Sequence, residues 1–134
     1  MITEQYVEFE TAKLLKEKGF NEDCMFVVNL DSNGILPCSF GTKNSEIDNK
    51  NIVTIPSQSL VMRWLREEKH FYIQIMLDSW ALGGHSGYYI VIQDINSEFK
   101  EISPIIDDNP DLVFFETYEQ AAESAIKYCL ENLI

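Results

Sequence analysis

The chain has 134 residues, of which 46% are hydrophobic and 24% charged, and its formal net charge is −12. This length and composition favour one packed globular domain over residues 1–134 that needs no disulfide or metal to fold, and they exclude a disordered chain. The acidic charge disfavours direct nucleic-acid binding, and the chain has neither a bilayer-spanning apolar run nor a secretory signal, so we expect a cytoplasmic protein without membrane contact.

The first predicted helix runs from about Glu4 to Lys18, with Thr3 as its N-cap and acidic residues in its first turns, where the helix dipole favours them. Gly19 is expected to end the helix in a Schellman motif that packs Phe20 against it. At 100° per residue, one stripe of this helix is predicted to face the core. The apolar residues of that stripe are Val7, Leu14 and Leu15.

A β-hairpin is predicted next. Met25–Leu30 and Ile35–Phe40 are short runs rich in β-branched and aromatic residues, and the Asn33-Gly34 pair between them supports positive φ in a tight turn. A brief strand at Ile52–Ile55 is expected after a polar surface loop.

The middle of the chain predicts a helix followed by a second hairpin. The helix covers roughly Gln58–Lys69 and places Trp64 on its core side. Phe71–Leu77 alternates apolar and other residues, and Tyr88–Ile95 is rich in β-branched residues and tyrosine, so these two segments should pair.

The last third combines an irregular acidic segment with a helix. Residues 96–114 lack periodicity, apart from a short edge strand near Val113–Phe115. Thr117 and Gln120 match a capping box, and an apolar helical face follows them. The order of elements predicts an α+β fold, with a mainly antiparallel sheet of four to six strands in hairpins and an N-terminal, a central and a C-terminal helix.

Four residues are candidates for an interaction surface. The loop Ser79–Gly87 contains Trp80, Leu82 and His85, and function is often carried by loops on rigid strands. The alternative is that Trp80 folds back as a lid on the core. Phe9 projects nearly opposite the core stripe of the first helix, so it is either exposed or covered by a dimer partner or by the loop before a later strand.

Other candidate sites match their motifs poorly. Cys24, Cys38 and Cys129 contain no CxxC pair and are interpreted as reduced core thiols, although one of them beside His70 or His85 could form a thiol–imidazole pair. The segment Asp107–Asp111 lacks the glycine and the glutamate of a calcium loop. We therefore predict no catalytic residue, no metal ligand and no cofactor.

Three segments carry a resemblance to a known group of proteins: YVEFETAKLLKEKGF at Tyr6–Phe20, PSQSLVMRWLRE at Pro56–Glu67 and TYEQAAESAIKYCLENLI at Thr117–Ile134. They resemble small uncharacterised proteins carried in phage and prophage regions of Bacteroides-type gut bacteria. The resemblance covers the three predicted helices and implies a bacterial cytoplasm and a mobile-element setting. It assigns no activity and no catalytic residue.

Three functions remain open from the sequence. The leading hypothesis is a non-enzymatic accessory protein that binds another protein through a sheet edge or the Trp80 loop, with a homodimer as one form. The second is an acidic inhibitor that imitates nucleic acid and blocks a host DNA-binding protein, because residues 94–134 carry ten acidic and two basic residues. The third, ranked last, is an enzyme with a hidden thiol or carboxylate site.

Overall fold

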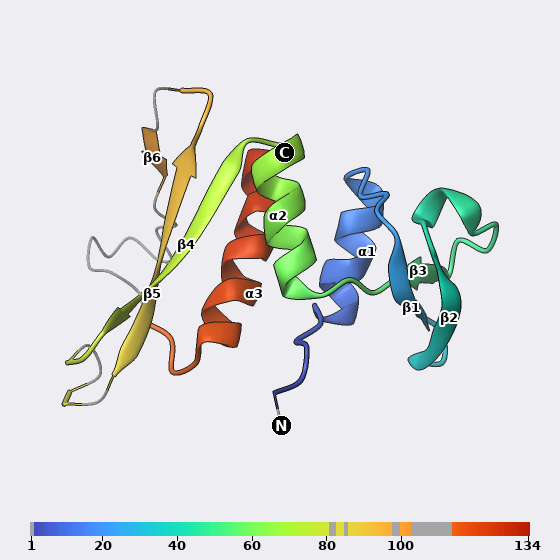
Figure 1. Cartoon of the computed structure of the whole chain (residues 1–134), viewed down its shortest axis with the longest axis horizontal. Helices are drawn as coiled ribbons and strands as arrows, with labels where there is room; N and C mark the ends of the chain where they lie inside the picture. The colour runs from blue at the N-terminus through green and yellow to red at the C-terminus, as the bar shows by residue number, and fades with distance from the viewer. Residues whose placement is uncertain (1, 81–82, 85, 98–99, 103–113) are drawn as a thin grey trace. The chain divides into compact units, whose positions relative to one another are not determined.

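The computed structural model describes residues 2–80, 83–84, 86–97, 100–102 and 114–134. These residues contain three α-helices and six strands, and every strand pair is antiparallel (Figure 1). The predicted α+β class with three helices is therefore confirmed. The strands form two three-stranded sheets, where the sequence analysis expected one. The chain divides into two compact units, Met1–Val61 and Met62–Ile134, and the expectation of a single domain stays a prediction.

The sheet of the first unit contains β1 (Cys24–Asn29), β2 (Gly34–Thr42) and β3 (Ile52–Thr54), in the order β2-β1-β3. The predicted hairpin is confirmed, because β1 pairs with β2. Asn33 adopts φ 56 in the turn, and its N–H donates to the Asn29 carbonyl at 2.7 Å. An asparagine tolerates this left-handed conformation better than most residues, so the turn is determined locally.

Helix α1 (Phe9–Glu17) begins five residues later than the predicted start at Glu4, so the assignment of Thr3 as N-cap is wrong. The preceding segment is extended instead. The Val7 N–H donates to the Pro56 carbonyl at 3.1 Å, and the Gln58 N–H donates to the Gln5 carbonyl at 2.8 Å. These bonds between distant parts of the chain outweigh the local helical preference of Glu4–Glu8.

The end of α1 follows the predicted Schellman motif. Gly19 has φ 90, its N–H donates to the Lys16 carbonyl at 3.2 Å, and the Phe20 N–H donates to the Leu15 carbonyl at 2.9 Å. Phe20 and Leu15 are both fully buried. The motif therefore satisfies two carbonyls of the last turn and anchors the chain where it leaves the helix.

A buried asparagine joins separate parts of the first unit. Asn44 begins the short 3-10 helix η1 (Asn44–Glu46); its Nδ2 donates to the Phe20 carbonyl at 2.9 Å, and its Oδ1 accepts from the Thr54 N–H at 3.0 Å. Both polar ends of the side chain are hydrogen-bonded, so its burial costs little. The apolar core of this unit includes Val7, Ala12, Leu15, Phe20, Val28, Val53 and Ile55.

The second unit contains the sheet β4-β5-β6, formed by β4 (Phe71–Asp78), β5 (Gly87–Asp94) and β6 (Lys100–Ile102). The β4–β5 hairpin confirms the prediction, and its register runs without irregularity from Phe71↔Asp94 to Asp78↔Gly87. Strand β6 falls within the segment expected to be irregular, so that expectation is wrong for residues 100–102. Phe115 forms an isolated bridge with Tyr88 near the expected edge strand, of which residue 113 lies outside the described residues.

Helix α2 (Gln58–Glu68) contains the boundary between the units and matches its prediction within one residue, with Trp64 buried as expected. Helix α3 (Tyr118–Tyr128) continues into the π-helical turn η2 (Cys129–Leu133). The capping box is present, because the Gln120 N–H donates to Thr117 Oγ1 at 3.1 Å and the Thr117 N–H donates to Gln120 Oε1 at 3.3 Å.

Helix α3 contacts β4 and β5, and small side chains on its buried face allow this approach. The buried residues of α3 and η2 include Ala121, Ala122, Ala125, Ile126, Cys129 and Leu130. The strand residues with the same burial, Ile73, Ile90 and Ile92, share one face of the β4–β5 ladder, because Ile73 pairs with Ile92. None of the described helices is both long and apolar enough to cross a membrane.

Candidate interaction surface

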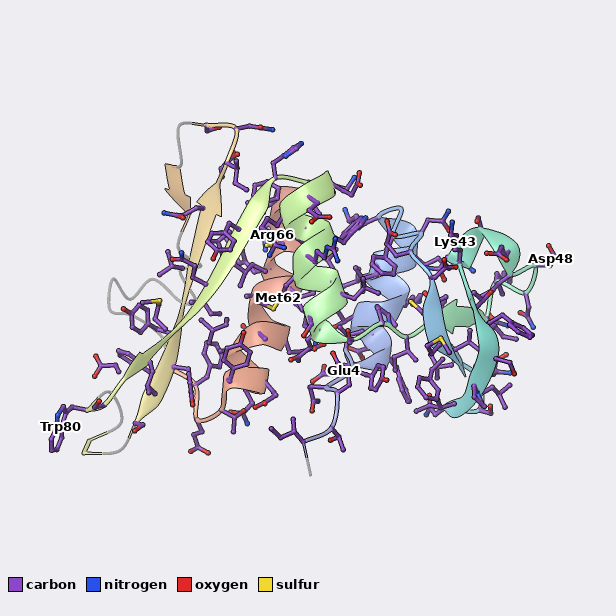
Figure 2. The ribbon with its side chains drawn as sticks, viewed as in Figure 1. Glu4, Lys43, Asp48, Met62, Arg66 and Trp80 are labelled. Atoms are coloured by element: carbon purple, nitrogen blue, oxygen red, sulfur yellow. The ribbon has the colours of Figure 1, made fainter. Side chains whose placement is uncertain are left out.

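The structure describes two of the four predicted interaction residues. Phe9 is the first residue of α1 in the first unit, and its side chain is half-buried. Trp80 belongs to the second unit and follows β4; Figure 2 shows its side chain at the end of the β4–β5 hairpin, pointing away from the strands. Leu82 and His85 lie outside the described residues.

The alternative in which Trp80 covers the core is wrong. Its side chain is 77% exposed, and its backbone N–H donates to Asp78 Oδ1 at 2.9 Å. This bond directs the chain into a turn directly after β4. Trp80 is therefore presented to solvent at the tip of a hairpin.

A larger group of exposed apolar side chains lies on and beside β2 in the first unit. We call it the β2 apolar surface, and it consists of Met25 (54% exposed), Ile35 (51%), Leu36 (56%) and Phe40 (100%). All nine residues of β2 are uncharged, and six of them are exposed. Single exposed apolar residues are common, but four on one strand and its neighbour require an explanation.

The position of β2 accounts for this exposure. β1 is its only strand neighbour in the described part of the chain, so β2 is an edge strand whose side chains are not covered as those of β1 are. Leu36 pairs with Val27, and Ile35 pairs with Val28. Because paired residues share a face of the sheet, Leu36 and Ile35 lie on opposite faces, and the apolar surface extends around the edge.

The backbone of β2 is poorly suited to accept another strand. The Ile55 N–H donates to the Phe26 carbonyl, and the Leu30 N–H donates to the Asn51 carbonyl. The backbone N–H and C=O groups of even-numbered β1 residues therefore point toward β3, and those of odd-numbered residues point toward β2. Because Leu36 pairs with Val27, the backbone groups of Leu36 point toward β1. At the next position, Pro37, a backbone N–H would point away from β1, toward the open edge of the sheet. Proline has no N–H, so this edge lacks a donor, a common means of preventing strand addition.

Phe40 lies in a bulge of β2. The register passes from Phe26↔Pro37 to Cys24↔Thr42, so Met25 alone lies opposite the four residues 38–41. Gly41 adopts φ 77, a conformation that side-chain-bearing residues rarely adopt, and this lets the bulged segment rejoin the ladder. Bulges reorient side chains, and Phe40 here is fully exposed.

A small hollow lies on the first unit, lined by Glu4, Tyr6, Asp23, Cys24, Met25, Ile55, Pro56, Ser57 and Leu60. Its volume is about 130 Å³, below the roughly 300 Å³ at which pockets for drug-sized ligands begin. The Tyr6 and Phe26 rings meet edge-to-face at 5.5 Å between centroids. Met25 belongs both to the lining of this hollow and to the β2 apolar surface, so the surface includes a shallow depression.

The alternative of a reactive thiol is disfavoured at two of the three cysteines. Burial raises the pKa of Cys24 from 9.0 to about 11, and the nearby carboxylates of Asp23 and Glu22 add to the rise. Burial also raises the pKa of Cys129 from 9.0 to about 12. Because the thiolate is the nucleophile, both thiols are held in their unreactive form near neutral pH.

The structure tests a thiol–imidazole pair only for Cys129 and His70, which share the second unit, because His85 lies outside the described residues. The Cys24 thiol, in the first unit, donates to the Glu22 carbonyl at 3.5 Å. Cys129 is fully buried, while His70 is exposed with φ 65 directly after α2. The acidic segment Asp107–Asp111 lies outside the described residues. Within the described ranges, no three His, Cys, Asp or Glu side chains gather as metal ligands would.

The β2 apolar surface was not among the candidate sites expected from the sequence. Its residues carry the usual signal of a strand, and that signal was interpreted correctly. The pattern could not reveal that β2 lies at the edge, because strand order depends on the pairing of β1 with β3 across more than twenty residues. A run of nine uncharged residues containing a proline was the one available indication.

Comparison with known proteins gives no relative: no family model, no curated protein and no solved structure matches the chain.

Proposed function

We propose that this chain is a non-enzymatic accessory protein, of phage or prophage type, that acts by binding another protein through the β2 apolar surface. Full exposure of Phe40 is the observation that carries the proposal. Burying an exposed aromatic ring in a partner's pocket removes a large apolar area from water, and aromatic residues are enriched in protein interfaces. Met25, Ile35 and Leu36 extend the apolar contact around it.

The expected partner presents a pocket or groove lined by apolar side chains rather than a free strand. Pro37 removes one outward donor, and the bulge at residues 38–41 interrupts the ladder, so backbone pairing contributes little. The affinity would then come from burying side chains around Phe40, with the hollow beside Met25 receiving a projecting side chain of the partner.

The cellular setting of the proposal rests on the resemblance of three segments to phage and prophage proteins. That resemblance supports a bacterial cytoplasm as the location. The three cysteines are free thiols, as is usual for proteins of a reducing compartment. In that compartment, host proteins and other phage-encoded proteins are the available partners.

Capture from bacterial lysate with matched variants tests the proposal. Phe40→Ser removes the exposed ring, and Trp80→Ser removes another exposed aromatic from the second unit as a control. Truncating a central aromatic anchor weakens binding by about 30-fold or more, so a partner captured by the wild type should be lost from Phe40→Ser and kept by Trp80→Ser. Circular dichroism should show both variants folded, because neither ring is buried.

The opposite pattern would contradict the proposal. A partner kept by Phe40→Ser but lost by Trp80→Ser would locate binding at the β4–β5 hairpin tip. A salt series separates the remaining alternative, because imitation of nucleic acid relies on charge and should weaken steeply between about 50 and 500 mM salt. Binding through the β2 apolar surface should change little over the same range.

A further inference from the structure

The outer edge of β4 offers a complete row of backbone groups. The Ile95 N–H donates to the His70 carbonyl at 2.9 Å. Because the β4–β5 register is unbroken, every second residue of β4 after His70 also points its backbone groups toward β5. Tyr88, the partner of Leu77, exchanges both backbone bonds with Phe115 on the other side of β5. Even-numbered residues of β4 therefore bond toward β5. The N–H and C=O groups that point away from β5 belong to Phe71, Ile73, Ile75 and Leu77.

Within the described residues, β4 is the only sheet edge without protection. β2 is interrupted by Pro37 and its bulge, and β3 and β6 are each three residues long. β4 has eight residues in unbroken register, and Phe71–Leu77 contains no charge, proline or glycine. Proteins usually blunt such an edge unless it is paired, because it accepts any extended chain.

The sequence of β4 is complementary to itself in one register. We propose that β4 pairs antiparallel with β4 of a second copy of this chain, about a two-fold axis at Gln74. In this register, Phe71 and Ile73 bond to Leu77 and Ile75 of the second copy. About eight backbone hydrogen bonds close across the axis, because each outward-pointing residue meets another. The two sheets become one continuous sheet with both copies of α3 on the same face.

Side chains on both faces gain partners in this register. Tyr72, Met76 and Leu77 are 37%, 41% and 57% exposed in the single chain. Tyr72 lies opposite Met76 of the second copy, which brings a thioether to an aromatic ring, and Leu77 lies opposite Phe71. Gln74 meets its own copy on the axis, where two amides can hydrogen-bond to each other.

The ends of the paired strands are also complementary. In the same register, His70 lies opposite Asp78 of the second copy, at both ends of the pair. The Asp78 Oδ1 atom accepts the Trp80 N–H, which leaves Oδ2 for an imidazole donor. A shift of the register by two residues would lose this contact and leave two residues of Phe71–Leu77 in each copy without a partner. The pairing of His70 with Asp78 at both ends therefore favours association of two identical strands over capture of an arbitrary peptide.

Sedimentation equilibrium of the full chain tests the proposal. The wild type should form a dimer at concentrations of about 100 μM or below. Gln74→Lys places two ammonium groups opposite each other on the axis and should weaken the dimer about fivefold or more, as should Gln74→Glu. Mixing these two variants should restore the dimer, because a lysine then faces a glutamate. Gln93→Lys, on the same face of β5 but away from the axis, is the matched control and should dimerise normally.

Several results would overturn this proposal. They are a monomeric wild type, a dimer unaffected by Gln74→Lys, or a mixture of the two Gln74 variants that fails to associate while both remain folded. The proposal is independent of the function assigned to the β2 apolar surface. Phe40→Ser should leave the dimer intact, and loss of the dimer in Phe40→Ser alone would move self-association to the first unit.

Discussion

Gly19 determines where α1 ends, and its role could be predicted from the sequence because it is local. Its φ of 90 is costly for any residue with a side chain, although a Cβ at this position would meet nothing within 4 Å. A side chain at position 19 would therefore cause backbone strain without any steric overlap. Gly19→Ala should lower the free energy of unfolding by about 1 kcal/mol, measured by urea denaturation.

The control for Gly19→Ala is Gly34→Ala, at a glycine outside the positive-φ region whose added Cβ would meet only the Ser32 hydroxyl oxygen at 3.3 Å. A serine side chain can rotate away, so the control should change stability by a few tenths of a kcal/mol at most. Equal losses in both variants would show that the left-handed conformation of Gly19 is not the cause.

The two buried cysteines should differ from Cys38 in reactivity. A pKa near 11 instead of 9.0 lowers the thiolate fraction of Cys24 near neutral pH by about a hundredfold, and Cys129 is suppressed further. Cys38 is half-buried on β2. Alkylation of the native protein at pH 7.5, followed by mass spectrometry, should modify Cys38 first and all three after unfolding. Faster labelling of Cys24 than of Cys38 would contradict the assigned burial.

The same shifts give a pH dependence with a definite sign. The folded-state pKa values of Cys24 and Cys129 lie above their unfolded values, so burial of the neutral thiols stabilises the fold fully below about pH 9. That stabilisation should be lost as the pH rises toward 11 and 12. Urea denaturation should show a shallower decline over this range in Cys24→Ala/Cys129→Ala than in the wild type.

At the scale of elements, hairpins and helix ends followed from short sequence patterns, whereas the start of α1 did not. The Asn33 turn and the Thr117 capping box depend on neighbours within a few residues, and both formed as predicted. The extended segment at Gln5–Val7 depends on bonds to Pro56 and Gln58, and no local pattern can report such pairing. The edge position of β2, and with it the exposure of Phe40, was hidden for the same reason.

Pro37 should limit strand addition at β2. Pro37→Val restores an outward N–H on an uncharged edge, so this variant should associate or aggregate at lower concentration than the wild type, as measured by light scattering. Ser39→Val is the matched control, because it adds the same apolar side chain to the same strand without changing a backbone donor. Equal association of the two variants would mean that surface apolarity, and not the missing donor, controls the edge.

At the scale of the whole molecule, the chain presents two surfaces with different chemistry in its two compact units. The first unit carries exposed side chains on an edge that is closed to backbone pairing, and the second carries an open backbone edge on β4. We therefore expect the first surface to select a partner by side-chain fit and the second to select an identical strand. A net charge of −12 keeps such a molecule soluble while these surfaces stay exposed.

Photo-crosslinking from position 40 tests the central claim most directly. The wild-type sequence with benzoylphenylalanine in place of Phe40 would be irradiated in bacterial cells, with the same probe in place of Trp80 as the comparison. The account predicts a covalent adduct with a second protein from position 40 and none of that mass from position 80. Absence of an adduct at position 40, or the same adduct from both positions, would contradict binding through the β2 apolar surface.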